Sequence, residues 1–162
     1  METSVERIRT PEGMETLLEY YKASMQMNEM DAKQYSPLVL AYIGDAVYEL
    51  MVRAKVVNGG NSSVNKLHKH SARLVCAQAQ AKLIKLLEAD LSQEELAVFK
   101  RGRNAKSVST AKNASVTDYR FATGFEALVG WLFLSEQFGR LIELVCLGLT
   151  RIGELEVCDT KN

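Results

Sequence analysis

No proline follows Pro37, so roughly the last three quarters of the chain lack the residue that most strongly interrupts a helix. Apolar residues recur through this stretch at spacings of three and four, which is the period of an amphipathic helix. No alternation of apolar and polar residues is long enough to indicate a strand. The sequence therefore predicts an all-α fold of about five to seven helices.

Local signals place the ends of these helices. Ser36 and Pro37 are typical of a helix start, with serine at the N-cap and proline in the first turn, and Gly59 is typical of its end. Ser92 begins a capping box with Glu95. The predicted helices are 14–26, 37–58, a continuous 63–89, 93–103, 117–137 and 140–155, with a polar loop over 104–116 and a break near Gly139.

A chain of 162 residues favours a single domain. The expected divisions are a flexible leader (1–12), one folded domain (13–155) and a tail (156–162). No apolar run reaches the length of a membrane span, and the N-terminus lacks the apolar core of a signal peptide. The cysteines lack metal-binding spacing and fit a reducing cytoplasm, with Cys76 and Cys146 expected to be buried thiols.

Two carboxylates stand in the middle of the two most apolar predicted helices. Asp45 directly follows Gly44, and Glu126 lies two residues after Gly124. A helix that is apolar nearly all round is buried on most of its surface, and buried carboxylates are rare unless paired, hydrogen-bonded or bound to metal. We therefore expect Asp45 and Glu126 to be buried, and to meet if their helices pack together. Oxygen ligands without His or Cys suit Mg²⁺ or Mn²⁺; the alternative is a buried ion pair or a helix cap.

Positive charge gathers in the segment KRGRNAKSVSTAK (100–112), which holds five basic residues and no acid although Lys and Arg (20) balance Asp and Glu (20) overall. Its candidate donors for RNA phosphates and 2′-hydroxyls are Arg101, Arg103, Asn104 and Lys106. The alternative is a solvated helix end, where the helix dipole favours cations. A second basic cluster over 66–73, which includes His68 and His70, is interpreted as a solvated face.

Four ordered segments carry a family resemblance: LAYIGDAVYEL (40–50), LHKHSARLVCAQAQA (67–81), KRGRNAKS (100–107) and YRFATGFEALVGWLFL (119–134). Together they resemble the ribonuclease III family over about residues 35–137, and most closely its short Mini branch, which lacks a double-stranded-RNA-binding domain. The resemblance implies the ribonuclease III endonuclease-domain fold and hydrolysis of double-stranded RNA with Mg²⁺, or Mn²⁺ as a substitute. By the same resemblance Asp45 matches the signature aspartate and Glu126 the essential glutamate, both metal-binding and catalytic.

The resemblance further implies a homodimer whose two active sites lie across one RNA duplex and leave short 3′ overhangs. For the Mini branch it implies maturation of the large-subunit (23S) ribosomal RNA precursor, in the bacterial cytoplasm or the plastid stroma. Candidate interface residues, which core packing explains equally well, are Tyr42, Tyr48, Met51 and Trp131. Two other functions remain as alternatives, a non-catalytic RNA-binding module and a helical phosphohydrolase acting on nucleotides.

The chain departs from the long forms of the family in its acids. Positions that carry carboxylates there hold Leu38, Ala41 and Thr123 here, which leaves the number of metal ions per site open. Glu49 lies four residues after Asp45 on the same helical face, and is predicted to pair with Arg53 rather than to join the site.

Overall fold

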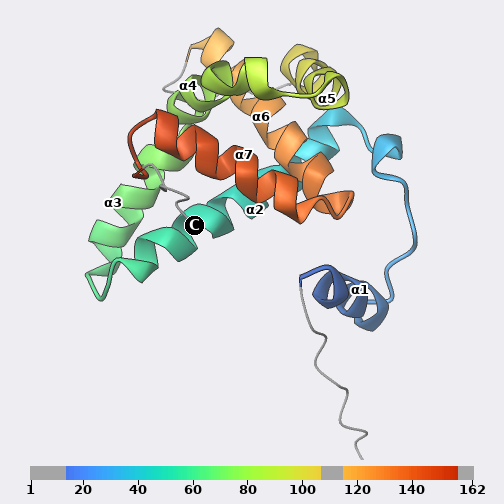
Figure 1. Cartoon of the computed structure of the whole chain (residues 1–162), viewed down its shortest axis with the longest axis horizontal. Helices are drawn as coiled ribbons and strands as arrows, with labels where there is room; N and C mark the ends of the chain where they lie inside the picture. Colours follow the sequence, from blue (N-terminus) through green and yellow to red (C-terminus); the bar gives the residue numbers. More distant parts are fainter. Residues whose placement is uncertain (1–13, 107–114, 157–162) are drawn as a thin grey trace, which may run out of the picture. The chain divides into compact units, whose positions relative to one another are not determined.

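The computed structural model describes residues 14–106 and 115–156 of the chain. The all-α prediction is confirmed, since these residues form seven α-helices, two short 3-10 helices and no strand (Figure 1). The helices are α1 (Met14–Ser24), η1 (Ala32–Gln34), α2 (Pro37–Asn58), α3 (Val64–Val75), α4 (Ala77–Leu87), η2 (Glu88–Asp90), α5 (Gln93–Asn104), α6 (Val116–Leu134) and α7 (Phe138–Arg151). The predicted leader, the middle of the polar loop and all but the first residue of the predicted tail lie outside the described residues.

Contacts divide the chain into two units, residues 1–30, which contain α1, and residues 31–162, which contain the other helices. The features described below belong to the second unit. Within the described part of the chain, no helix combines the length and apolar character that crossing a membrane requires.

The predicted helix caps are confirmed. The Ser36 hydroxyl accepts a hydrogen bond from the backbone N–H of Val39 at 3.3 Å, and α2 ends just before Gly59. The Ser92 hydroxyl accepts from the Glu95 N–H at 3.1 Å, while the Ser92 N–H donates to the Glu95 carboxylate at 2.8 Å. Local side-chain chemistry therefore fixes where α2 and α5 begin.

The prediction of one continuous helix over α3 and α4 is wrong. The chain breaks at Cys76, whose backbone is extended, with a φ of −65° and a ψ of 154°. Side chains take carbonyl groups that a continuous helix would use: the Tyr48 hydroxyl of α2 donates to the Leu74 carbonyl at 3.1 Å, and the Gln80 amide of α4 donates to the Val75 carbonyl at 2.8 Å. One tertiary and one local side-chain hydrogen bond thus compensate for the interrupted helix.

Three smaller predictions are also wrong. Asn104 is the last residue of α5 rather than part of the loop. The break before α7 falls at 135–137, where Glu136 has a φ of +59°, and Gly139 lies inside the first turn of α7. Cys76 and Cys146 are exposed, because Cys76 lies at the helix break and Cys146 on an outward face of α7.

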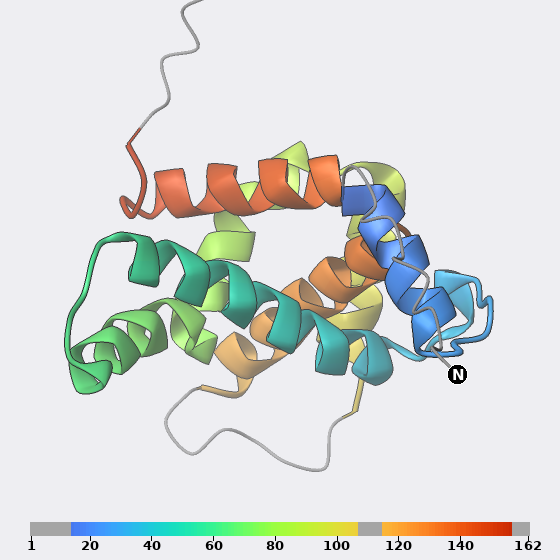
Figure 2. The same ribbon diagram turned by 90° about the horizontal axis from the view of Figure 1, so that it is seen from below.

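Helix α6 lies at the centre of the second unit and packs against α2, α4, α5 and α7. Figure 2 shows α2 crossing α6, with α7 along another side of the unit. Tyr48 of α2 and Phe125 of α6 meet edge to face in the core, with ring centroids 5.0 Å apart. The buried residues of α6 run along most of the helix: Ala122, Thr123, Gly124, Phe125, Ala127, Leu128, Val129, Gly130, Trp131 and Leu132.

Two glycines allow α5 and α6 to come close. A Cβ atom on Gly102 would lie 2.7 Å from the Cβ of Ala127, and one on Gly124 would lie 2.7 Å from the Phe99 ring and 2.8 Å from the Phe99 carbonyl oxygen. Such separations are too short for a real side chain, so α5 is seated on α6 through positions that have none.

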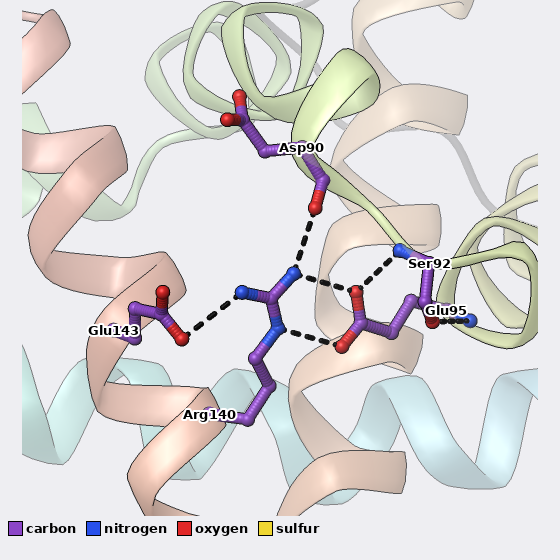
Figure 3. Close-up of polar contacts among 5 residues, drawn as sticks. All are labelled: Asp90, Ser92, Glu95, Arg140 and Glu143. Carbon is purple, nitrogen blue, oxygen red and sulfur yellow. Dashed lines mark hydrogen bonds and ion pairs between the residues drawn. The ribbon is translucent and has the colours of Figure 1, made fainter.

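An arginine on α7 joins the start of α5 to η2 (Figure 3). Arg140 donates to both carboxylate oxygens of Glu95, at 2.8 and 3.0 Å, to the Asp90 carbonyl at 2.7 Å and to Glu143 at 3.0 Å. Glu95 is buried, and the hydrogen bonds from Arg140 hold its pKa below its usual range. This charged cluster is structural: it fixes the end of α5 that lies away from the basic segment.

The expectation that α2 is buried on most of its surface is wrong. Several of its large apolar side chains are exposed: Leu38, Val39, Tyr42, Leu50 and Val57. Tyr42 is 83% exposed, whereas Tyr48 and Trp131, also candidates for an interface, belong to the core and Met51 is partly buried against it. An apolar stripe on a helix does not distinguish a core face from a face left uncovered in the single chain.

Candidate active site

The two predicted acids come together where α2 crosses α6. The backbones of α2 and α6 touch at Gly44 and Glu126, and Asp45 and Glu126 lie close enough for each to shift the pKa of the other, so the expectation that they meet is confirmed. The expectation of full burial is wrong, because Asp45 is exposed and Glu126 is only partly buried. The reason is the uncovered face of α2, which leaves the site open to solvent on the Asp45 side.

Glycines set the separation of these two helices. A Cβ atom on Gly44 would lie 1.7 Å from the carbonyl oxygen of Glu126, and one on Gly130 would lie 2.0 Å from the carbonyl oxygen of Leu40. The backbones of α2 and α6 therefore touch directly beside both acids. The sequence interpretation of Gly44, as room for another group near Asp45, is confirmed, and the group is the backbone of Glu126 itself.

The two carboxyl groups influence each other's pKa. Burial raises the pKa of Glu126 to about 8, the negative charge of Asp45 adds to this, and a hydrogen bond from Gln80 opposes it. Partial burial and the charge of Glu49 raise the pKa of Asp45, while the interaction with Glu126 lowers it. Glu126 is thus the protonated member near neutral pH.

The neighbouring positions explain why only two acids gather here. Glu49 accepts a hydrogen bond from the Arg53 Nε at 2.8 Å, which confirms the predicted ion pair. Ala41 is buried in the core, and the Thr123 hydroxyl donates to the Tyr119 carbonyl at 3.0 Å along its own helix. Neither position presents an acid, and Glu49 influences Asp45 only through its charge.

Gln80 is a residue of the site that the sequence reasoning missed. Its side-chain Nε2 donates to the Glu126 Oε1 at 3.1 Å, and the residue is only 1% exposed. A signal was present, because Gln80 occupies the buried stripe of α4 formed with Ala81, Ile84 and Leu87. A lone polar residue in an apolar stripe is informative in the same way as the two acids.

The donor set fits a hard divalent cation. The described residues hold no group of three or more His, Cys, Asp or Glu side chains that could bind a metal ion, so Asp45 and Glu126 are the carboxylates available at this crossing. Mg²⁺ commonly takes one or two protein carboxylates and completes its shell with water or phosphate oxygens. The charge of Asp45 raises the pKa of Glu126 because two ionised carboxylates repel each other, so added positive charge at this point is stabilising. The residues present therefore suit Mg²⁺ or Mn²⁺ better than zinc.

The predicted RNA-binding residues lie at the end of α5. Arg101, Asn104 and Lys106 are exposed, and Arg103 is partly buried, with its guanidinium 5.6 Å from the ring centroids of Phe99 and Phe121. These aromatic rings hold the Arg103 side chain in place.

A small pocket of about 170 Å³ adjoins this end of α5, lined by Arg103, Asn104, Thr117, Arg120 and Phe121. It adds Arg120, from the start of α6, to the basic surface. The basic cluster over 66–73 is exposed on α3, in agreement with its interpretation as a solvated face. The structure thus places cations on the two helices, α5 and α6, that are seated together beside the acid pair.

The raised pKa of Glu126 predicts how metal-free stability depends on pH. Between its unfolded value near 4.5 and about 8, the folded state binds more protons at this site than the unfolded state, so stability falls as pH rises through this window. We expect the melting temperature in EDTA to drop between pH 5 and 8 by more in the wild type than in a Glu126→Gln variant, whose side chain does not titrate. An equal drop in melting temperature for the two proteins would contradict the raised pKa of Glu126.

Comparison with known proteins gives consistent matches. The Ribonuclease III domain family matches residues 38–137. A Mini-ribonuclease 3 from Clostridium tetani is 48% identical over 143 residues, covering 88% of this chain and 95% of that protein. A Mini-ribonuclease 3 from Enterococcus faecalis is 48% identical over 76% of this chain and 96% of its own length. The crystal structure of a protein from Fusobacterium nucleatum, 29% identical, superposes with a TM-score of 0.69 over 78% of this chain and all of that one.

Proposed function

This chain belongs to the ribonuclease III family, in its Mini-ribonuclease 3 branch, and is an endoribonuclease, and we propose that it cleaves double-stranded RNA with Mg²⁺ held by Asp45 and Glu126. The proposed substrate is the large-subunit (23S) ribosomal RNA precursor, and the proposed location is the bacterial cytoplasm. One observation carries the proposal. The acids that match the family's signature aspartate and essential glutamate meet at the crossing of α2 and α6.

The chain's own residues prepare this chemistry in two ways. With a cation bound, Glu126 would release its proton to solvent, which would leave two negative carboxylates at the site. Asp45 stands on the exposed side of the crossing, where a large substrate has access, while Glu126 is partly buried. A divalent cation held by Asp45 and Glu126 would supply the positive charge that activates a water molecule and stabilises charge on the phosphodiester.

The basic end of α5 is the proposed contact with the RNA backbone. Arg101, Arg103, Asn104 and Lys106 offer hydrogen-bond donors there, and aromatic stacking already orders Arg103. Such donors suit phosphate oxygens and 2′-hydroxyls, and the 2′-hydroxyls distinguish an RNA duplex from DNA without any reading of base sequence. Because phosphate contacts dominate this kind of interface, binding is expected to weaken steeply with salt.

A homodimer is proposed to bring two such sites to one RNA duplex. The exposed apolar side chains of α2, among them Tyr42 and Leu50, support an interface on the helix that carries Asp45. Pairing would also double the number of phosphate contacts per complex, which raises affinity. A sedimentation experiment at micromolar concentration tests this; an 18 kDa particle would contradict it, since 18.1 kDa is the mass of one chain.

The activity is tested by incubating the protein with an end-labelled ribosomal precursor duplex, in Mg²⁺ and in EDTA, and mapping both cut strands. We expect cleavage only with the metal, at staggered positions that leave short 3′ overhangs. The matched substrate control is either strand of the duplex alone, which should stay intact.

Two other outcomes separate the alternatives. A duplex that is bound but survives intact in both Mg²⁺ and Mn²⁺ would contradict catalysis and favour an RNA-binding module. Turnover of small nucleotide phosphates without effect on the duplex would favour a nucleotide phosphohydrolase.

A further inference from the structure

Gln80 is the most unusual polar residue of the core. It is 1% exposed and lies on α4 among Ala81, Ile84 and Leu87, each of which is fully buried. An apolar side chain of similar length at this position would continue the packing of α4 against α6 without any polar atom to satisfy. The role of the buried amide therefore lies in its hydrogen bonds and not in core packing.

Both donors of the Gln80 amide are used, and their partners fix its direction. Nε2 donates to the Val75 carbonyl at 2.8 Å and to the Glu126 Oε1 at 3.1 Å. Exchanging nitrogen and oxygen would place Oε1 against two acceptors, so only the observed orientation forms hydrogen bonds. The Val75 carbonyl is free to accept because α3 ends at the break next to it, at Cys76.

The same orientation leaves the amide oxygen without a partner. Among the described residues, Gln80 Oε1 is the only buried side-chain nitrogen or oxygen that makes no hydrogen bond. An unsatisfied buried acceptor lowers stability, and the two hydrogen bonds that Nε2 donates offset this cost. One of the two is a hydrogen bond in a fixed direction to the Glu126 carboxyl group.

We infer that Gln80 is a positioning residue that holds the Glu126 carboxylate in the orientation required for divalent-cation binding. The inference rests on the proposed function. Its structural basis is a chain of contacts that runs from the break at Cys76, through the Val75 carbonyl and the Gln80 amide, to Glu126. With only two acids at the crossing, the orientation of each one has a larger effect on cation affinity than in a site with more ligands.

A Gln80→Met variant tests the inference, since methionine keeps the length of the side chain and removes both donors. We expect its Mg²⁺ dissociation constant, measured by calorimetry without RNA, to rise by about tenfold or more. The Mg²⁺ concentration that half-saturates RNA cleavage should rise in parallel, and saturating Mg²⁺ should restore the cleavage rate with the KM for RNA unchanged. The matched control is Gln78→Met, which makes the same change at an exposed position of the same helix.

The outcomes separate this inference from the proposed function. A folded Gln80→Met protein whose Mg²⁺ affinity is within twofold of wild type would overturn the inference alone, as would an equal loss in Gln78→Met. A wild-type protein that neither binds Mg²⁺ nor cleaves duplex RNA would overturn both.

A measurement on the wild type keeps the test decisive if the variant does not fold. In an NMR titration with Mg²⁺, the side-chain amide signals of Gln80 should shift with the same half-saturation that calorimetry gives, and those of Gln78 should stay in place. Gln80 signals that do not move while Mg²⁺ binds would overturn the inference.

Discussion

Replacing Glu126 with glutamine is expected to lower the rate of RNA cleavage by roughly a thousandfold or more, because several kcal/mol of transition-state stabilisation depend on the cation that this carboxylate would hold. The fold should survive, since glutamine resembles the protonated form of Glu126. RNA binding should also persist, because the proposed phosphate contacts lie at the end of α5. The measurement pairs single-turnover cleavage in Mg²⁺ with a binding assay in EDTA.

The matched control is Glu94→Gln, which removes one negative charge from an exposed residue whose ion pair with Lys33 contributes little. It should cleave like wild type. Asp45→Asn should reproduce the loss seen with Glu126→Gln, and the double variant should be little worse than either, because residues that act as a unit are not additive. Cleavage at the wild-type rate by either single variant would remove these acids from the mechanism.

Replacing Gly44 with alanine is expected to destabilise the fold by about 3 kcal/mol or more, which corresponds to a fall in melting temperature on the order of 10 °C. The added Cβ would stand 1.7 Å from the Glu126 carbonyl oxygen and 2.7 Å from the Gly130 nitrogen. Both are backbone atoms, so no side-chain rotation relieves the overlap and α2 must move away from α6. Thermal unfolding followed by circular dichroism measures the effect.

The control for Gly44 lies in another helix. Gly139, in the first turn of α7, has nothing within 4 Å of an added Cβ, so Gly139→Ala should leave stability unchanged or raise it by up to about 1 kcal/mol through better helix propensity. Equal melting temperatures for the two alanine variants would show that the α2–α6 contact tolerates a side chain. Because the same movement separates Asp45 from Glu126, residual folded Gly44→Ala protein should also cleave RNA poorly.

The meeting of Asp45 and Glu126 was predictable from the sequence. Each acid stands in an apolar helix, where an unpartnered carboxylate is costly, and Gly44 indicates the close approach of another group. The partner of that glycine was not predictable, since nothing local says that the approaching group is the backbone of α6.

The break between α3 and α4 was missed for a physical reason. The residues around Cys76 include no glycine or proline and favour a helix locally. The interruption depends on the Tyr48 hydroxyl and the Gln80 amide, which arrive from α2 and from further along the chain to occupy the carbonyl groups. Only the tertiary structure brings these donors into place, and the same arrangement turns Gln80 toward Glu126.

The extent to which α2 is covered was misjudged because composition records how apolar a helix is, not what lies against it. Leu50 and Tyr42 look like core residues in the sequence and are exposed in the chain. The burial of Asp45 was wrongly predicted for the same reason.

The glycine contacts on both sides of α6 also bear on protein engineering. Gly44 and Gly130 seat α2 on this helix against backbone atoms, whereas Gly102 and Gly124 seat α5 on it against the Ala127 Cβ and the Phe99 ring. The spacing of the two acids from each other is therefore set by backbone contact and depends little on side chains elsewhere in the core. A thermostable version of this enzyme can be sought by redesigning the contacts of α4 with α7, while the small-residue positions of α6 are left untouched.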